Sequence, residues 1–159
     1  MGLTLDLIDQ AKQLATYQGT KATQASLRRA VSTAYYALFH LLTQDAASRW
    51  PGAAETRTAI ERGFRHSLMK SVSRGFQKPQ WKDHHGAFRQ IPPELRSVAG
   101  AFGDLQEKRP TADYDNHHAW SPSDVREIVS RAEEACQAWH LTREDPMAGN
   151  YLIAMLLGK

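Results

Sequence analysis

Titratable side chains are concentrated in one stretch of the chain, Leu105 to Trp120, where arginine, aspartate, tyrosine and histidine all occur within ten residues. A guanidinium can stabilise the negative charge that develops on a phosphorane. An imidazole with a pKa near neutrality can exchange protons with an attacking 2′-hydroxyl or with a leaving group. Arg109 and His117 therefore predict a metal-free site for phosphodiester cleavage, with Asp113 and Tyr114 as further candidates between them.

The same spacing also allows a purely structural interpretation. Arg109 would then form an ion pair with Asp113 or Asp115 at a helix end, and His117 would be solvated. Tyr114 is a poor general base because its unperturbed pKa is about 10. It can still donate a hydrogen bond to a phosphate, stack on a base, or pack against the protein.

A metal site is the other chemistry that these residue types suggest. Asp83, His84 and His85 could join the aspartates and histidines of residues 113–118 across two loops. This spacing matches no standard zinc pattern, and adjacent histidines on one loop seldom reach the same ion. The sequence also lacks a glycine-rich phosphate loop, a paired-cysteine motif, a nucleophile elbow and an HExxH motif. We therefore predict no metal and no cofactor, which leaves metal-free acid–base chemistry as the main candidate among enzymes.

A second stretch, Ser26 to Leu42, combines a wide apolar stripe with a separate polar arc. The arc consists of Arg29, Thr33, Tyr36 and His40, which are spaced by four, three and four residues. Side chains at such spacing lie on one side of a helix. We expect this arc to face a partner or a cleft.

Apolar periodicity predicts the helices that position these residues. We expect an all-α protein, an up-and-down bundle of four core helices plus one or two extra helices, in a single domain over residues 1–159. No stretch alternates at period two, and all seven prolines fall between or at the starts of proposed helices. Thr23 or Ser26 would cap the second helix, and Ser121 would cap the helix that starts there. The predicted helices are Leu3 to about Tyr17 with Gly19 as its stop, Ser26 to about Ala47, Ala54 to Ser73, Pro92 to Arg109, Ser121 to about Leu141, and Met147 to Leu157, with Arg74 to Ile91 as a loop or a short helix followed by a turn.

Composition sets broad limits on compartment and partners. Apolar residues make up 42% of the chain and the net charge is only +3, so basicity alone does not indicate a nucleic-acid partner. A basic bias between Arg57 and Arg96 would form one positive surface if these residues share a side, although a solvated helix face is the commoner explanation. One cysteine, Cys136, fits a buried thiol in a reducing compartment. With no secretory signal and no long apolar run, we expect a cytoplasmic protein without membrane contact.

Two segments together resemble the HEPN (higher eukaryotes and prokaryotes nucleotide-binding) superfamily. RRAVSTAYYALFH is similar to the second helix of that bundle, and the R-x-x-A-D-Y-D sequence that starts at Arg109 is similar to a variant motif of some bacterial members. The resemblance implies a homodimer in which the motifs of both subunits meet in a shared cleft. It also implies a metal-independent endoribonuclease of a toxin–antitoxin or antiphage defence system, with a cognate antitoxin or another operon partner. Arg109 is then the phosphate-binding residue, and Arg29, Tyr36 and His40 line the same cleft for RNA or nucleotide.

The nuclease motif of that superfamily has an arginine, a polar residue directly after it, and a histidine that four to six residues separate from the arginine. Here seven residues separate Arg109 from His117, Pro110 follows the arginine, and Tyr114 stands where an active member has histidine. Two functions therefore stay open. One is RNA cleavage with Arg109, Asp113, Tyr114 and His117 as motif residues. The alternative is a catalytically inactive helical module that binds nucleotide, RNA or a partner protein or mediates dimerisation.

Overall fold

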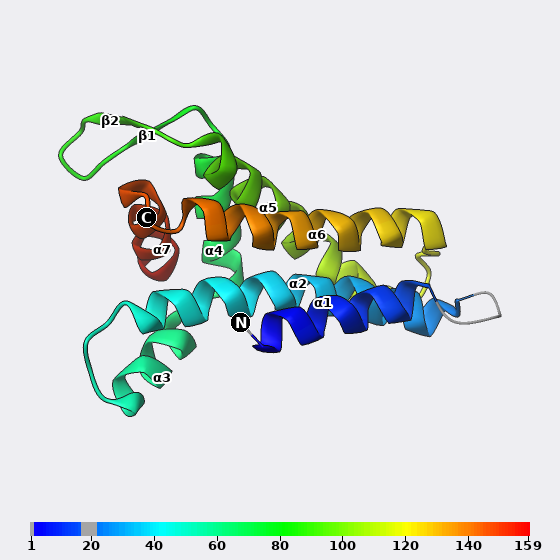
Figure 1. The fold of residues 1–159 in the computed structure, drawn as a ribbon. Coiled ribbons are helices and arrows are strands. Elements are labelled where there is room, and N and C mark those ends of the chain that lie inside the picture. Colours follow the sequence, from blue (N-terminus) through cyan, green and yellow to red (C-terminus); the bar gives the residue numbers. More distant parts are fainter. Residues whose placement is uncertain (1, 17–21) are drawn as a thin grey trace.

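The computed structural model describes residues 2–16 and 22–159, and over these residues it confirms the all-α prediction. Seven helices and one two-stranded hairpin are present in that part of the chain (Figure 1). The helices are α1 (Gly2–Ala15), α2 (Gln24–Ser48), α3 (Ala54–Gly63), α4 (His66–Phe76), α5 (Pro93–Tyr114), α6 (Pro122–Thr142) and α7 (Pro146–Leu157), and the strands are β1 (Gln80–Lys82) and β2 (Phe88–Gln90).

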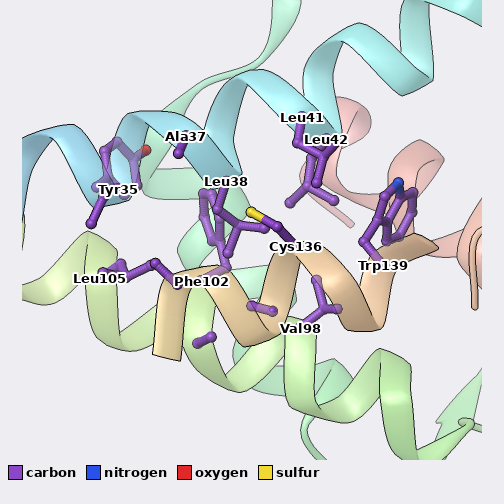
Figure 2. Packing of buried hydrophobic residues seen from close by; sticks show 14 of the residues in the cluster. Tyr35, Ala37, Leu38, Leu41, Leu42, Val98, Phe102, Leu105, Cys136 and Trp139 are labelled. Carbon is purple, nitrogen blue, oxygen red and sulfur yellow. The ribbon is translucent and has the colours of Figure 1, made fainter. Parts of the chain in front are cut away.

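Helix α2 is the centre of the bundle. It packs against α1, α5 and α6, because its apolar stripe is wide enough to face all three neighbours. Figure 2 shows Leu38 and Leu42 of α2 directed toward Phe102 of α5 and Trp139 of α6. Full burial of an apolar side chain of this size contributes about 1.5–3 kcal/mol relative to an exposed one. This packing fixes the polar groups that α2 carries on its other sides.

Two predicted helix starts, those of α2 and α6, are confirmed by their caps. The Thr23 side chain accepts a hydrogen bond from the backbone N–H of Ser26 at 3.1 Å, and the Ser121 hydroxyl accepts one from Asp124 at 3.1 Å. Pro122 occupies the first turn of α6, where its missing N–H costs nothing. The predicted end of the first helix at Tyr17 and its stop at Gly19 lie outside the described residues.

The prediction of one helix from Ala54 to Ser73 is wrong. The chain leaves helical geometry at Phe64 (φ −72°, ψ 128°) and Arg65 (φ −116°, ψ 122°), which separates α3 from α4. The Phe64 side chain is buried in the core, whereas α3 has no buried residue. Burial of one phenylalanine therefore turns the chain here, and His66 becomes the first residue of a new helix.

The region predicted as a loop or a short helix with a turn contains more structure than expected. Helix α4 continues to Phe76, and β1 and β2 then pair as an antiparallel hairpin that extends away from the bundle (Figure 1). Gly86 at φ 81° forms its turn. Each strand has only three residues and is largely exposed, which is too short for a sustained alternation of apolar and polar residues. No strand was predicted here for this reason, and the small hairpin leaves the fold in the all-α class.

The predicted helix end at Arg109 is also wrong, because α5 continues through Pro110 to Tyr114. Ala112 is buried and holds this last turn on the bundle. Pro110 is therefore inside a helix, not between helices as expected from the sequence. The consequence for function is direct: Arg109 and Asp113 lie on one helix, one turn apart.

Two other expectations concern the single cysteine and the possibility of a membrane-crossing helix. Cys136 is buried, as predicted, and burial raises the pKa of its thiol to about 12. Across the described residues, no helix combines the length and the apolar character that a membrane crossing requires.

Candidate functional site

A chain of polar contacts links α5, α2 and α4 and is here named the Arg109 cluster: Ser32, Tyr35, His66, Arg109 and Asp113. Arg109 Nη1 donates to Asp113 Oδ2 at 3.1 Å, as expected for positions i and i+4 of one helix. The other Asp113 oxygen accepts a hydrogen bond from the Ser32 hydroxyl on α2. Asp113 thus orients the guanidinium and ties the last turn of α5 to α2.

Tyr35 lies between the cation and the imidazole. The Arg109 Cζ atom is 5.4 Å from the centroid of the fully buried Tyr35 ring, in a cation–π contact. The Tyr35 hydroxyl is hydrogen-bonded to Nδ1 of His66. Burial raises the pKa of Tyr35 well above its ordinary value, so the phenol stays protonated. One tyrosine therefore holds both the guanidinium and the imidazole.

His66 contributes the imidazole of the cluster. Its ring is half-buried and lies 4.6 Å from the ring of Phe39, measured between centroids. Burial lowers the pKa of His66 below 6.5, and electrostatic interactions with Arg109 and His40 lower it further. The imidazole is therefore neutral at pH 7. If Nδ1–H donates to the phenol, Nε2 is free to accept a proton; if the phenol donates to Nδ1, Nε2 carries a proton that it can give away.

Sequence reasoning did not identify His66 as a site residue. It lies far along the chain from Arg109, in a segment whose other titratable side chains are all lysine or arginine, so no mixed cluster of titratable groups distinguishes it. The break before it comes from the burial of Phe64 in the core, which no local sequence pattern indicates. A histidine at the start of a helix is close to the helix N-terminus, which disfavours its charged form.

The polar arc of α2 lines an open hollow of about 430 Å³ together with Leu7 and Gln10 of α1. Arg29, Tyr36 and His40 project together into it, as the spacing predicted. The rings of Tyr36 and His40 are stacked, with centroids 5.9 Å apart and planes at 27°. The Tyr36 ring also lies 6.5 Å from the His66 ring, so the hollow adjoins the Arg109 cluster.

The remaining candidates, Tyr114 at the last position of α5 and His117 in the turn after it, lie outside the cluster. Tyr114 is 75% exposed, and His117 is exposed with its backbone N–H bonded to Asp115 Oδ1 at 2.9 Å. Within residues 22–159, His117 makes no hydrogen bond or ion pair with Arg109. The ring of His118 instead packs on Trp120, with centroids 4.5 Å apart. The structure thus brings Arg109 to Asp113, as the structural interpretation expected, and leaves His117 apart from both.

The two loops considered for a metal site lie at opposite ends of the molecule (Figure 1). The Asp83 carboxylate binds Arg89 at 2.9 Å and accepts hydrogen bonds from the backbone of His85 and Ala87, which holds the hairpin turn. Asp115 serves the turn after α5 in the same way. Among the described residues, no group of three or more histidine, cysteine or acidic side chains could hold a metal ion.

Comparison with known proteins identifies no relative of this chain. No protein-family model, no curated protein and no solved structure gives a significant match to the chain. The Arg109 cluster and the hollow beside it are the features that bear on function.

Proposed function

We propose that this chain is a HEPN-like RNA-binding protein that cleaves RNA at the Arg109 cluster without a metal ion. The observation that carries the proposal is the pairing of Arg109 and His66 on one tyrosine. A guanidinium and a neutral imidazole contact the same buried ring from two helices, so both groups are held in place before a substrate binds. This is the pair of chemical groups that phosphodiester cleavage requires.

The reaction divides between the two groups. Arg109 binds the non-bridging oxygens of the scissile phosphate and stabilises their charge in the transition state. Neutral His66 takes the proton of the ribose 2′-hydroxyl, whose oxygen then attacks phosphorus. The bond from phosphorus to the 5′-oxygen breaks, and that oxygen leaves with a proton from water or from an imidazolium. The products are a 2′,3′-cyclic phosphate and a 5′-hydroxyl end.

The other members of the cluster position these two groups. Asp113, held by Ser32, directs the guanidinium, and Tyr35 fixes the ring of His66. In the adjoining hollow, the stacked Tyr36 and His40 rings offer an aromatic face to an unpaired base.

The biological setting is proposed from the family resemblance. In this proposal the protein is a cytoplasmic homodimer that acts as a toxin or an antiphage defence component, with a cognate antitoxin or another operon partner. The exposed position of the motif end, from Tyr114 onward, supports a contact with a second chain there.

The Arg109–Asp113 ion pair favours a second candidate function. A guanidinium that already has a carboxylate partner is partly neutralised, which suits a module that binds RNA or nucleotide without turnover. This candidate makes a different prediction from the first. It expects RNA binding by the wild-type protein and no cleavage.

The test is RNA cleavage by the purified protein with end-labelled structured and unstructured RNAs, with and without EDTA. Cleavage should survive EDTA, yield cyclic phosphate ends, and fall by about 10²–10⁴-fold in His66→Gln, with a comparable loss in Arg109→Ala. His140→Gln, at an exposed position of α6, is the matched control and should cleave normally. His117→Ala tests whether the exposed loop histidine supplies the leaving-group proton.

Each other outcome has a defined meaning. Binding without cleavage by folded wild-type protein would favour the non-catalytic module. Full cleavage by His66→Gln would contradict the assignment of the base, and cleavage abolished by EDTA would contradict a metal-free mechanism.

A further inference from the structure

The segment from Arg65 to Lys82 differs in charge from the rest of the chain. It contains five lysine and arginine residues and no aspartate or glutamate, whereas charges of both signs alternate along most of the sequence. The segment includes all of α4 and the first strand of the hairpin. Its cations are Arg65, Lys70, Arg74, Lys78 and Lys82.

These cations form a line that starts at the Arg109 cluster. His66, Lys70 and Arg74 are spaced by four residues, so each lies one helical turn after the last. The buried face of α4 is made by Met69, Val72, Ser73 and Phe76, and the line runs along its flank. Lys70 is half-buried, while Arg74 and Lys78 are exposed. The rotation of the helix thus carries the line outward to solvent.

The fold continues this line onto the hairpin. Helix α4 has 11 residues and is therefore about 16 Å long. Figure 1 shows it crossing from the side of α2 and α3, where His66 lies, to the base of the hairpin. Lys82 is exposed on β1 and lies over the ring of Phe88, at 5.9 Å from its centroid.

The charges on this line are not neutralised by neighbouring groups. Within the described residues, Lys70, Arg74, Lys78 and Lys82 form no ion pair, and Asp83 is already bound to Arg89. Helix α7, which packs against α4, contains no charged residue, and the acidic side chains of α5, its other packed neighbour, form no ion pair with these cations among the described residues. A row of cations without local partners attracts a polyanion.

We propose that α4 and the hairpin form a basic track that binds the sugar–phosphate backbone of a single RNA strand as it leaves the cleavage site. This inference rests on the proposed function, since RNA is the polyanion that the Arg109 cluster would act on. The track starts with His66 and continues through Lys70, Arg74 and Lys78 to Lys82. It contacts phosphates and therefore binds without reading sequence.

The experiment measures binding apart from cleavage, using fluorescently labelled 2′-O-methyl RNA, which has no free 2′-hydroxyl to attack the phosphate. Fluorescence anisotropy follows binding of oligonucleotides of about 4 and about 12 nucleotides over a range of salt concentrations. The track variant combines Lys70→Gln, Arg74→Gln and Lys78→Gln. The matched control removes the same charge from α1 and α6 with Lys12→Gln, Arg126→Gln and Arg131→Gln.

The track variant should bind the longer RNA at least about tenfold more weakly. The slope of log affinity against log salt should decrease in magnitude by about 2, because each lost phosphate contact removes about 0.7. The shorter RNA should lose less affinity. The control triple variant should keep the wild-type slope. If thermal unfolding shows that the track variant is destabilised, the double variant Arg74→Gln, Lys78→Gln replaces it, because it changes only exposed residues. Its salt slope should decrease in magnitude by about 1.4.

Two results would overturn the track. Equal losses of RNA affinity in the track and control variants would show that only net charge matters. No loss of affinity in either variant would show that RNA does not contact α4. In both cases, RNA binding by the wild type would leave the proposed function standing. Absence of any RNA binding by folded wild-type protein would instead overturn the proposed function and the track together. Tighter binding of an acidic peptide than of RNA at equal salt would also overturn the track.

Discussion

At the scale of single residues, Tyr35 determines how the candidate site is built. Its ring is buried against Phe102, with centroids 5.6 Å apart, and its two polar neighbours are held on the side that faces α4 and the end of α5. Because burial keeps the phenol protonated, Tyr35 adds no negative charge that would compete for the guanidinium. Arg109 keeps a positive charge near His66, which in turn stays neutral.

The electrostatic link between Arg109 and His66 can be measured without any activity. Arg109→Gln should raise the pKa of His66 toward 6.5, because one of the charges that lowers it is removed while the burial remains. An NMR titration of the histidine ring protons reads this directly. Arg126→Gln, on α6, removes the same charge elsewhere and should leave His66 unchanged. An unchanged His66 in Arg109→Gln would mean that the two groups are not coupled.

The sequence was sufficient for the residues that share one helix, and insufficient for those that meet across helices. Arg29, Tyr36 and His40 follow from a spacing that any α-helix converts into one side. His66 reaches Tyr35 only because Phe64 turns the chain and starts α4 at that point. Such a contact depends on the packing of two helices, which no local pattern encodes.

At the scale of elements, long helices with a periodic apolar stripe were predictable and their ends were less so. The N-terminal caps of α2 and α6 were identified because Thr23 and Ser121 use local hydrogen bonds. The C-terminal end of α5 was placed too early, since a proline usually stops a helix. Pro110 is tolerated there because the buried Ala112 keeps the final turn on the bundle. That single turn decides whether Asp113 can reach both Arg109 and Ser32.

A buried carboxylate joins the C-terminal ends of α2 and α6. Asp45 has a 7% exposed side chain and binds Arg49 at 2.9 Å from one oxygen and Nε of Arg143 at 3.1 Å from the other. Asp45→Ala should lower the free energy of unfolding by about 2 kcal/mol. This is less than the about 3–5 kcal/mol typical of a fully buried pair, because both arginines are about a third exposed and regain water.

Urea unfolding monitored by circular dichroism measures this loss. Glu144→Ala, which removes an 85% exposed partner of Arg143, is the control and should change stability by less than about 0.5 kcal/mol. Equal effects of the two substitutions would show that the Asp45 contacts do not stabilise the junction of α2 and α6.

At the scale of the whole molecule, two half-buried histidines make stability depend on pH. Burial lowers the pKa of both His40 and His66 below the ordinary 6.5. The unfolded chain therefore binds protons at these positions at a higher pH than the folded protein does. The contribution to stability is fully present above pH 6.5 and decreases as the pH falls from there toward the lowered folded-state values.

The double variant His40→Gln, His66→Gln should show a smaller loss of stability between neutral pH and pH 5 than the wild type does. Thermal unfolding at several pH values gives the comparison. The exposed pair His84→Gln, His85→Gln serves as the control and should retain the wild-type pH dependence. An identical pH dependence in all three proteins would show that other groups govern acid stability.

The arrangement of the cluster also bears on how two subunits would work together. The HEPN resemblance implies a homodimer with a shared cleft. Light scattering tests whether the purified protein has the mass of a dimer. Arg109 and His66, however, contact the same Tyr35 within one chain. Each subunit should therefore hold a complete pair, with the second subunit adding surface for RNA rather than a missing acid–base group.

Mixing two inactive variants separates these arrangements. Arg109→Ala and His66→Gln are unfolded together, refolded together so that mixed dimers form, and assayed for RNA cleavage. If each pair is complete within one chain, no subunit of a mixed dimer has both groups, and cleavage should stay at the level of the separate variants. If Arg109 of one subunit works with His66 of the other, a mixed dimer contains one intact pair. About a quarter of the wild-type activity would then return, because about half of the dimers are mixed and each has one of two sites restored. Wild-type chains refolded with Arg109→Ala provide the positive control, since they should retain about half of the activity per chain under either arrangement.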